Sequence, residues 1–245
     1  MMVKKILLCF IASLFLFPAL VFAKEDNFVV LSENTKYYKT ETYLEGINKN
    51  KSITYEITKE EYDSVNVEEM LRSNPTTVNT TYKSMTSSIL ANGSYYRYKN
   101  VLNWKTMPST RSYDIIGIGF LQSVKVHSNT TYFEQYYCYT GGSCYYSYSN
   151  TPQIFVSGAG TSFELPSGNL NTLRQTFYFD VEKNTNSTIY SQYAYGDYSH
   201  ATSTISQSNA TNYSVIQSGG IVLDSSIISY YDSISTATAS WSGSW

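Results

Sequence analysis

The chain of 245 residues is poor in charge and rich in tyrosine: only 15% of its residues are Asp, Glu, Lys or Arg, and 25 are Tyr. A coiled coil or a helical bundle needs more Glu, Lys and Ala, and a disordered acidic tail needs a larger net charge than −2, so the composition argues against all three. Tyr and Thr fit the pleated, half-exposed surface of a sheet, which favours an all-β protein.

Residues 1–23 have the pattern of a secretory signal peptide. Two lysines precede a long apolar run, and the run ends at Ala23, a small residue suited to cleavage. The alternative is a retained anchor helix, because Ile6 to Phe22 approaches the length of a membrane span. We expect cleavage, and therefore a secreted or surface-associated chain with no transmembrane segment left.

Loss of the two signal lysines changes the net charge from −2 to −4. No cluster of Lys or Arg remains that could follow a phosphate backbone, so nucleic acid is not an expected partner.

Residues 24–75 predict strands and one short helix. Residues 27–31, 36–44 and 52–57 have β-like patterns. Thr58 to Glu61 forms a capping box, which predicts a helix from Lys59 to Ser64, and a second helical signal lies near residues 67–71. We expect residues 24–75 to belong to the same domain as the β-rich residues 76–245.

The most apolar predicted strand covers residues 113–126. Ile116 and Ile118 share one face, while Gly117 and Gly119 lie on the other. A strand with one apolar and one glycine face is expected to be central, and either another segment packs closely on the glycines or the strand bends there.

Residues 131–139 and 144–148 predict a hairpin around Gly141-Gly142. Its tip places Cys138 opposite Cys144, which favours a disulfide in an exported chain. A redox or zinc pair is the alternative, but the spacing is not C-x-x-C and no histidine lies nearby. Tyr139 and Tyr145 beside the cysteines are candidate ligand-contact residues.

The later segments complete the predicted fold. Further strands are expected at residues 153–156, 161–165 after a Gly-Ala-Gly turn, 173–182, 188–195, 213–217, 221–223 and 227–231. About ten short strands separated by turns predict one antiparallel β-sandwich of jelly-roll type, with the single short helix near its N-terminus.

A first candidate binding site combines Trp104, Arg111 and Asp114. An aromatic ring can stack on a sugar while the charged pair bonds its hydroxyl groups. The structural alternative is that Arg111 and Asp114 pair to fix the turn into the strand, with Trp104 packed beneath.

A second candidate site surrounds Gly196, where a turn is expected. Tyr195, Asp197 and His200 would form a polar and aromatic patch that binds a ligand or a calcium ion, although one aspartate supplies few of the six to eight oxygens that calcium needs. The alternative is a turn with a hydrogen-bonded histidine.

The motifs of zincins, α/β-hydrolases, P-loop proteins and Rossmann dinucleotide-binding proteins do not occur, and no cofactor is expected. A glycosidase needs only two carboxylates about 5–10 Å apart and stays open. Its candidate carboxylates are Asp114, Glu134, Glu164, Asp180, Asp197, Asp224 and Asp232.

Residues 82–120, especially Asn92 to Tyr98 and Trp104 to Asp114, and also residues 193–231, resemble uncharacterised secreted proteins of low-GC Gram-positive bacteria. The resemblance implies an exported bacterial protein. It assigns no activity and no catalytic residue.

Together these patterns favour a non-catalytic binding or adhesion protein with a glycan or protein ligand, because Tyr, Ser and Asn make adaptable contact surfaces. One alternative is a pore-forming toxin, since residues 76–90 and 200–216 are long, polar and rich in Ser and Thr. The other alternative is a glycan-active hydrolase.

Overall fold

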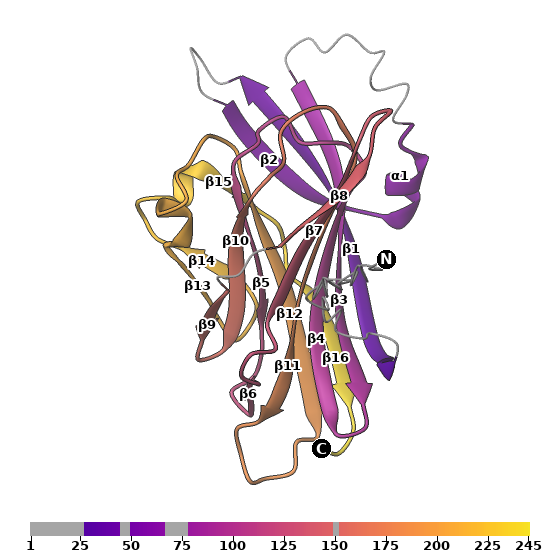
Figure 1. The fold of residues 1–245 in the computed structure, drawn as a ribbon, viewed down its shortest axis with the longest axis vertical. Coiled ribbons are helices and arrows are strands. Elements are labelled where there is room, and N and C mark those ends of the chain that lie inside the picture. The colour runs from indigo at the N-terminus through magenta and orange to yellow at the C-terminus, as the bar shows by residue number, and fades with distance from the viewer. Residues whose placement is uncertain (1–26, 45–49, 67–77, 149–151) are drawn as a thin grey trace, which may run out of the picture.

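The computed structural model describes residues 27–44, 50–66, 78–148 and 152–245, so the expected signal peptide and the second helical signal near residues 67–71 lie outside the described residues. Antiparallel strands form two large sheets that pack face to face in an elongated, sandwich-like fold (Figure 1). The all-β antiparallel class is therefore confirmed, while the jelly-roll strand order stays a prediction.

The larger sheet has eight strands. Along its path the order is β2 (Asn50–Ile57), β1 (Val29–Leu44), β3 (Val78–Asn92), β4 (Tyr95–Trp104), β11 (Leu170–Lys183), β7 (Tyr132–Tyr139) and β8 (Cys144–Tyr148), and β6 (Val124–Val126) pairs with β11. β1 pairs with β3 from Val29 opposite Ala91 to Tyr43 opposite Val78. Most of the polar segment considered for pore formation, residues 76–90, thus lies in an interior strand of this sheet.

The second sheet has six strands. Its path is β15 (Tyr231–Ser233), β12 (Ser191–Ala201), β5 (Tyr113–Gly119), β10 (Gly158–Glu164) and β9 (Gln153–Phe155), and β16 (Ala237–Ser242) pairs with β12. A separate hairpin joins β13 (Tyr213–Val215) to β14 (Ile221–Leu223).

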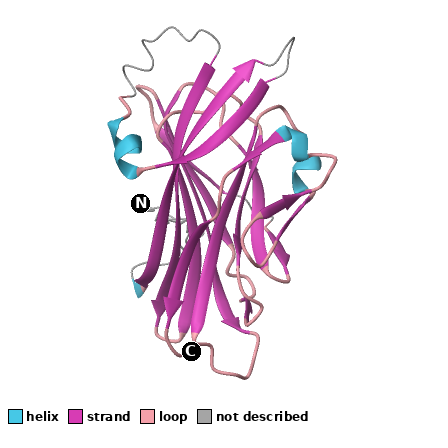
Figure 2. Ribbon diagram, turned by 180° about the vertical axis from the view of Figure 1, so that it is seen from behind, coloured by secondary structure: helices cyan, strands magenta, loops and turns pink. Residues whose placement is uncertain are grey.

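In the part of the chain that the structure describes, helices are short, and Figure 2 shows them on opposite flanks of the strands. The helix α1 (Lys59–Ser64) begins after Thr58, whose hydroxyl accepts a 3.1 Å hydrogen bond from the Glu61 amide, as the capping box predicts. Two 3₁₀ turns, Asn209–Thr211 and Ile228–Tyr230, were not expected from the sequence.

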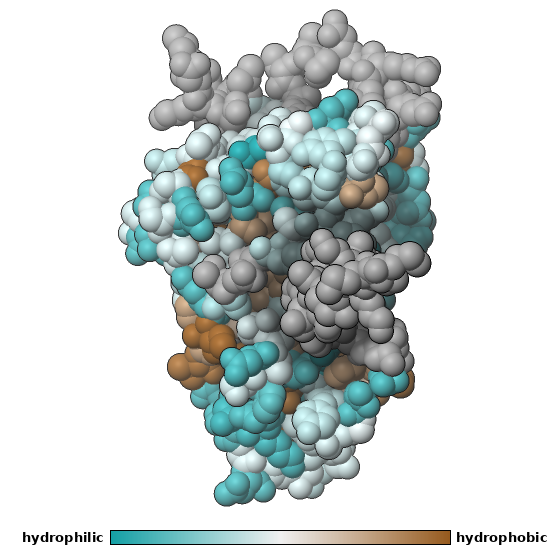
Figure 3. Space-filling model, viewed as in Figure 1, coloured by the Kyte–Doolittle hydropathy of each residue, from teal (hydrophilic) through white to brown (hydrophobic). Residues whose placement is uncertain are grey.

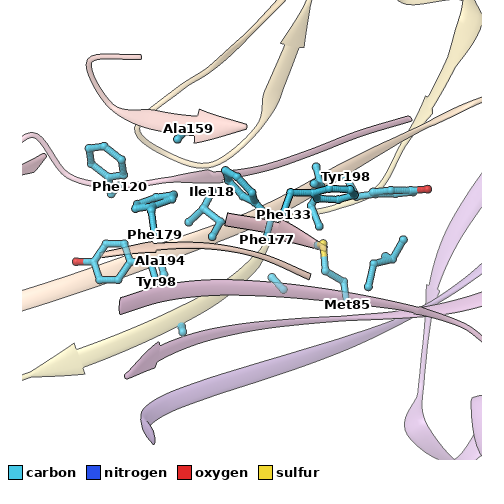
Figure 4. Close-up of a cluster of buried hydrophobic side chains, with 14 of the residues drawn as sticks. Met85, Tyr98, Ile118, Phe120, Phe133, Ala159, Phe177, Phe179, Ala194 and Tyr198 are labelled. Atoms are coloured by element: carbon cyan, nitrogen blue, oxygen red, sulfur yellow. The ribbon is translucent and has the colours of Figure 1, made fainter. Parts of the chain in front are cut away.

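An aromatic core fills the space between the two sheets (Figure 4). The rings of Phe120 and Phe179 meet edge to face with centroids 5.7 Å apart, and Phe177 packs against Phe179 at 5.8 Å. The buried hydroxyl of Tyr98 donates to Gln192 Oε1 at 3.0 Å. Phe177 and Phe179 therefore point inward, as the alternation of β11 predicts.

The glycine face of β5 is closely covered, as expected. A Cβ atom on Gly117 would lie 3.0 Å from Val215 Cγ2, and one on Gly119 would lie 2.3 Å from the Ile216 carbonyl oxygen. The β13–β14 hairpin, joined by Ile216 and its neighbours, therefore packs on β5 at a distance that only glycine permits.

Two boundary predictions are wrong. The apolar segment 113–126 is not one strand, because β5 ends at Gly119 and residues 124–126 pair with β11 in the other sheet. The Gly-Ala-Gly sequence 158–160 is not a turn: it begins β10, where Gly158 and Gly160 also face Val215. The glycines at the end of β5 and at the start of β10 allow another segment to pack closely on the strand, and they do not reverse the chain.

The face of the molecule seen in Figure 3 is mostly polar, with an apolar patch over β9. Ile154 is 56% exposed there, and Val156, one residue past the end of β9, is 79% exposed. Among the described residues, no helix has the length and apolar character needed to cross a membrane.

Candidate functional site

A cluster of polar side chains crosses the interface between the two sheets. On the six-stranded sheet, His200 of β12 is the direct partner of Asp232 of β15, and Asp114 of β5 lies on its other side. On the facing sheet, Lys83 of β3 is paired with Trp104 of β4. We call Lys83, Trp104, Asp114, Tyr198, His200 and Asp232 the buried polar cluster.

Asp114 is the best-bonded member of the buried polar cluster. Its carboxylate is fully buried and accepts hydrogen bonds from the Tyr198 hydroxyl, from His200 Nδ1 at 2.9 Å and from the Ala201 amide at 2.8 Å. Because a carboxylate only accepts, Nδ1 carries the ring proton of His200. The edge of Trp104 packs against this imidazole at 5.1 Å between ring centroids.

Lys83 is the least satisfied member. Its side chain is fully buried, and its ammonium nitrogen lies 3.9 Å from Asp232 Oδ2 and 4.9 Å from the centre of the Trp104 ring. It makes no hydrogen bond with any residue that the structure describes. Burial lowers the pKa of Lys83, and the charges of Asp232 and Asp114 oppose that shift.

A pocket of about 360 Å³ opens next to the buried polar cluster, between the β7–β8 hairpin and the segment after β10. Alternate side chains of the hairpin point into it, and Arg111 reaches it from the loop before β5. Its lining residues are Arg111, Gln135, Tyr137, Tyr139, Ser147, Glu164, Leu165, Pro166 and Ser167.

Three tyrosines stand together on the pocket face of the hairpin. Tyr137 stacks on Tyr145 with centroids 5.7 Å apart, and Tyr139 meets both rings edge to face at 5.8 Å. Gly168, with a φ of +97°, lets the chain pass beside Tyr139, because a Cβ there would lie 2.9 Å from the ring. We call Tyr137, Tyr139 and Tyr145 the tyrosine triad.

The disulfide expected at the hairpin tip is confirmed. Cys138 and Cys144 are bonded, with 4.0 Å between their Cα atoms, and Gly141 adopts a φ of +68° in the intervening turn. Because side chains alternate along a strand, the disulfide lies on the face opposite the tyrosine triad. It holds the two strands together without occupying the pocket.

Arg111 and Asp114 do not form the ion pair that was expected, as one alternative, to fix the turn into β5. The Asp114 oxygens bond to β12, whereas Arg111 lines the pocket and has one terminal nitrogen buried without a hydrogen-bond partner among the described residues. Burial lowers the pKa of the Arg111 guanidinium, and the nearby Asp114 charge opposes this shift. Arg111 therefore lines the pocket as a cation that is partly removed from water.

The second candidate site does not form a single patch. The expected turn at Gly196 is wrong, because β12 runs on through it, so Tyr195 and Asp197 face away from His200. Asp197 is buried and accepts from the Tyr198 amide at 2.7 Å and the Ile221 amide at 2.5 Å, which leaves its carboxylate engaged by backbone. Tyr195 stacks on Tyr193 instead, at 5.8 Å.

The structure thus joins Trp104, Asp114 and His200 in the buried polar cluster. It brings Arg111 and Tyr139 together in the lining of the neighbouring pocket, and Tyr145 packs against Tyr139 beside it.

Sequence reasoning missed Lys83 and Gln135. Lys83 had a signal, since it shares the parity of the buried Met85 and Ile89 on β3. Gln135 likewise shares the parity of Tyr137 and Tyr139.

Compared with known proteins, the chain matches no protein-family model, and no curated protein shows significant similarity to it.

Proposed function

We propose that this is a secreted or surface-exposed binding protein that recognises a glycan in the pocket beside the β7–β8 hairpin. The observation that carries the proposal is the convergence of outward tyrosines with Arg111 on one concave site. Sugar rings offer apolar faces and a rim of hydroxyl groups, and this pocket offers aromatic rings together with charged and amide groups.

The polar lining supports a sugar ligand more than an apolar one. Arg111 supplies N–H donors, Glu164 supplies an acceptor, and Ser147 can do either, while the Gln135 amide holds Ser147 and the Glu164 carbonyl in place. Arg111 lines this pocket as a cation, and a guanidinium can donate several N–H groups to ligand oxygens.

The rigidity of the hairpin also supports binding. The tyrosine triad packs ring against ring, and the Cys138–Cys144 bond fixes the two strands behind it. Side chains that are already ordered lose little entropy when a ligand arrives. A disulfide fits an oxidising compartment, in agreement with the expected export of the chain.

The test is glycan-array screening of residues 24–245 followed by calorimetric titration of the best ligand. We expect Tyr139→Ala and Arg111→Gln each to weaken binding by about tenfold or more, because each removes a direct contact worth about 1–2 kcal/mol. Tyr190→Ala is the matched control, since Tyr190 is 71% exposed and does not line the pocket.

Two results would contradict the proposal. The first is the absence of any bound glycan at millimolar concentration. The second is a ligand whose affinity falls equally in the Tyr190→Ala control and the pocket variants.

A further inference from the structure

Lys83 and Asp232 meet across the interface between the two sheets. Lys83 comes from β3, inside the eight-stranded sheet, and Asp232 comes from β15, at the margin of the six-stranded sheet. Their side chains are 0% and 9% exposed, and the nitrogen lies 3.9 Å from the nearer carboxylate oxygen. A fully buried amine is therefore held beside a carboxyl group that is itself almost buried.

The contact is unusual for a buried ion pair. A stable buried pair needs good hydrogen bonds, because both charges have lost their hydration. Here 3.9 Å exceeds hydrogen-bond distance, and the nitrogen has no hydrogen-bond partner among the described residues. The rings of Trp104 and Tyr198 lie 4.9 and 5.7 Å from it. The site therefore brings the two groups close without giving the Lys83 ammonium a hydrogen bond.

We propose that Lys83 Nζ and the side-chain carboxyl carbon of Asp232 condense to an amide, a covalent cross-link between the two sheets. This inference is independent of the proposed glycan pocket.

The reaction balances without a further reactant. One proton passes from the Lys83 ammonium to the Asp232 carboxylate, which gives a neutral amine and a carboxylic acid. The amine nitrogen then forms a bond to the carboxyl carbon. One C–O bond breaks, and the oxygen leaves as water with the acid proton and a second proton from nitrogen.

Three surrounding features favour this step. Burial lowers the pKa of Lys83, which favours the neutral, nucleophilic amine. The Thr54 hydroxyl donates to Asp232 Oδ2, so it can stabilise negative charge that develops on that oxygen. Asp232 also lines an open pocket of about 310 Å³, through which the released water can leave.

The remaining charged neighbours do not compete for the nitrogen. Asp114 is occupied by Tyr198, His200 and the Ala201 amide. Its charge opposes the lowering of the Lys83 pKa, but the effect of burial is larger. Asp232 is thus the carboxylate in reach of the amine.

Intact-mass spectrometry of purified residues 24–245 under denaturing conditions tests the proposal. The expected mass is lower by one water than the mass of the sequence with its disulfide. Tryptic digestion should then give one branched peptide in which Lys83 is joined to Asp232.

Two variants test whether the loss of one water comes from Lys83 and Asp232. Lys83→Arg keeps the buried positive charge but lacks an amine that can form this amide, and Asp232→Ala lacks the carboxyl group. Both should have the full sequence mass.

Loss of water in Lys83→Arg would point to cyclisation of an aspartate with its own backbone and would overturn the cross-link. A wild-type chain of full mass, with a linear Lys83 peptide, would also overturn it. Neither wild-type measurement requires a variant to fold.

Discussion

Single residues in the interior show how strongly this fold depends on buried polar groups. Asp197 is the clearest case outside the buried polar cluster. Its two oxygens accept the amides of Tyr198 and Ile221, and so attach the start of β14 to β12. Burial nevertheless outweighs these bonds and raises the pKa of Asp197 from 3.8 to about 7. The folded protein therefore binds a proton on Asp197 more tightly than the unfolded chain does.

This shift predicts a pH dependence of stability. Because the folded pKa is raised, the protonated form favours folding, and stability is lost as the pH rises from about 4 to 7. The loss is at most about 4 kcal/mol, at 1.36 kcal/mol for each pKa unit. Urea unfolding of wild type and Asp197→Asn across this range measures it, and the difference between the two should vary with pH.

Asp224→Asn is the control for this prediction. Asp224 is an exposed carboxylate whose pKa is lowered by hydrogen bonds from Ser226, so its effect on stability belongs to lower pH. The variant should keep the wild-type pH dependence between pH 4 and 7. If Asp197→Asn also kept that dependence in full, Asp197 would not be its source.

Among the elements, the β7–β8 hairpin is the one whose stability depends most on a covalent bond, the Cys138–Cys144 disulfide. β8 is an edge strand, and Tyr145, Tyr146 and Tyr148 on it are 48%, 55% and 45% exposed. Few buried contacts therefore hold it, apart from its pairing with β7 and the disulfide.

We expect the double variant Cys138→Ser/Cys144→Ser to lose about 2 kcal/mol of unfolding free energy, since the bond closes only a short loop. The larger effect should be local. Amide hydrogen exchange in residues 132–148 should speed up, while exchange in β3 and β4 should stay close to that of wild type. Unchanged exchange in the hairpin would show that strand pairing alone fixes it.

For the whole molecule, the N-terminal strands are part of the sandwich. β1 pairs along the length of β3, and it also reaches the second sheet. The buried Tyr38 hydroxyl donates to the Ser235 carbonyl, and Asn34 Nδ2 donates to the Thr238 carbonyl at 3.0 Å. Removing β1 would leave β3, now an interior strand, as an open edge of the sheet.

A chain that begins at residue 76 is therefore expected not to fold. It should lack cooperative unfolding by circular dichroism and should aggregate, whereas residues 24–245 should unfold in one transition. A soluble fragment 76–245 with a cooperative transition would show that residues 24–75 are dispensable.

Local patterns predicted the strands well where one strong signal was present. The alternation in β11, the capping box at Thr58 and the Gly-Gly tip of the disulfide hairpin all have their expected structures. These signals come from the alternation of side chains along a strand, from local hydrogen bonding and from the backbone conformations open to glycine. All three depend only on residues that are close in sequence.

The sequence could not predict which distant segments meet. The pocket needs Arg111 beside Tyr139, and the buried polar cluster needs Lys83 beside Asp232, and both contacts depend on sheet order. The turn expected at Gly196 is wrong for a related reason: this glycine makes room for the Asn100 side chain, which would lie 2.7 Å from a Cβ there. A glycine that admits a distant residue looks, in sequence, like a glycine that turns the chain.

The glycine face under the β13–β14 hairpin also protects the alignment of the second sheet. If β5 slipped by one residue against β12 or β10, the bulky side chains of Ile116 and Ile118 would meet Val215, and the glycines would leave voids in the core. Both defects would arise from the same slip, so the packing of the hairpin on the glycines adds to the free-energy difference that favours the observed register.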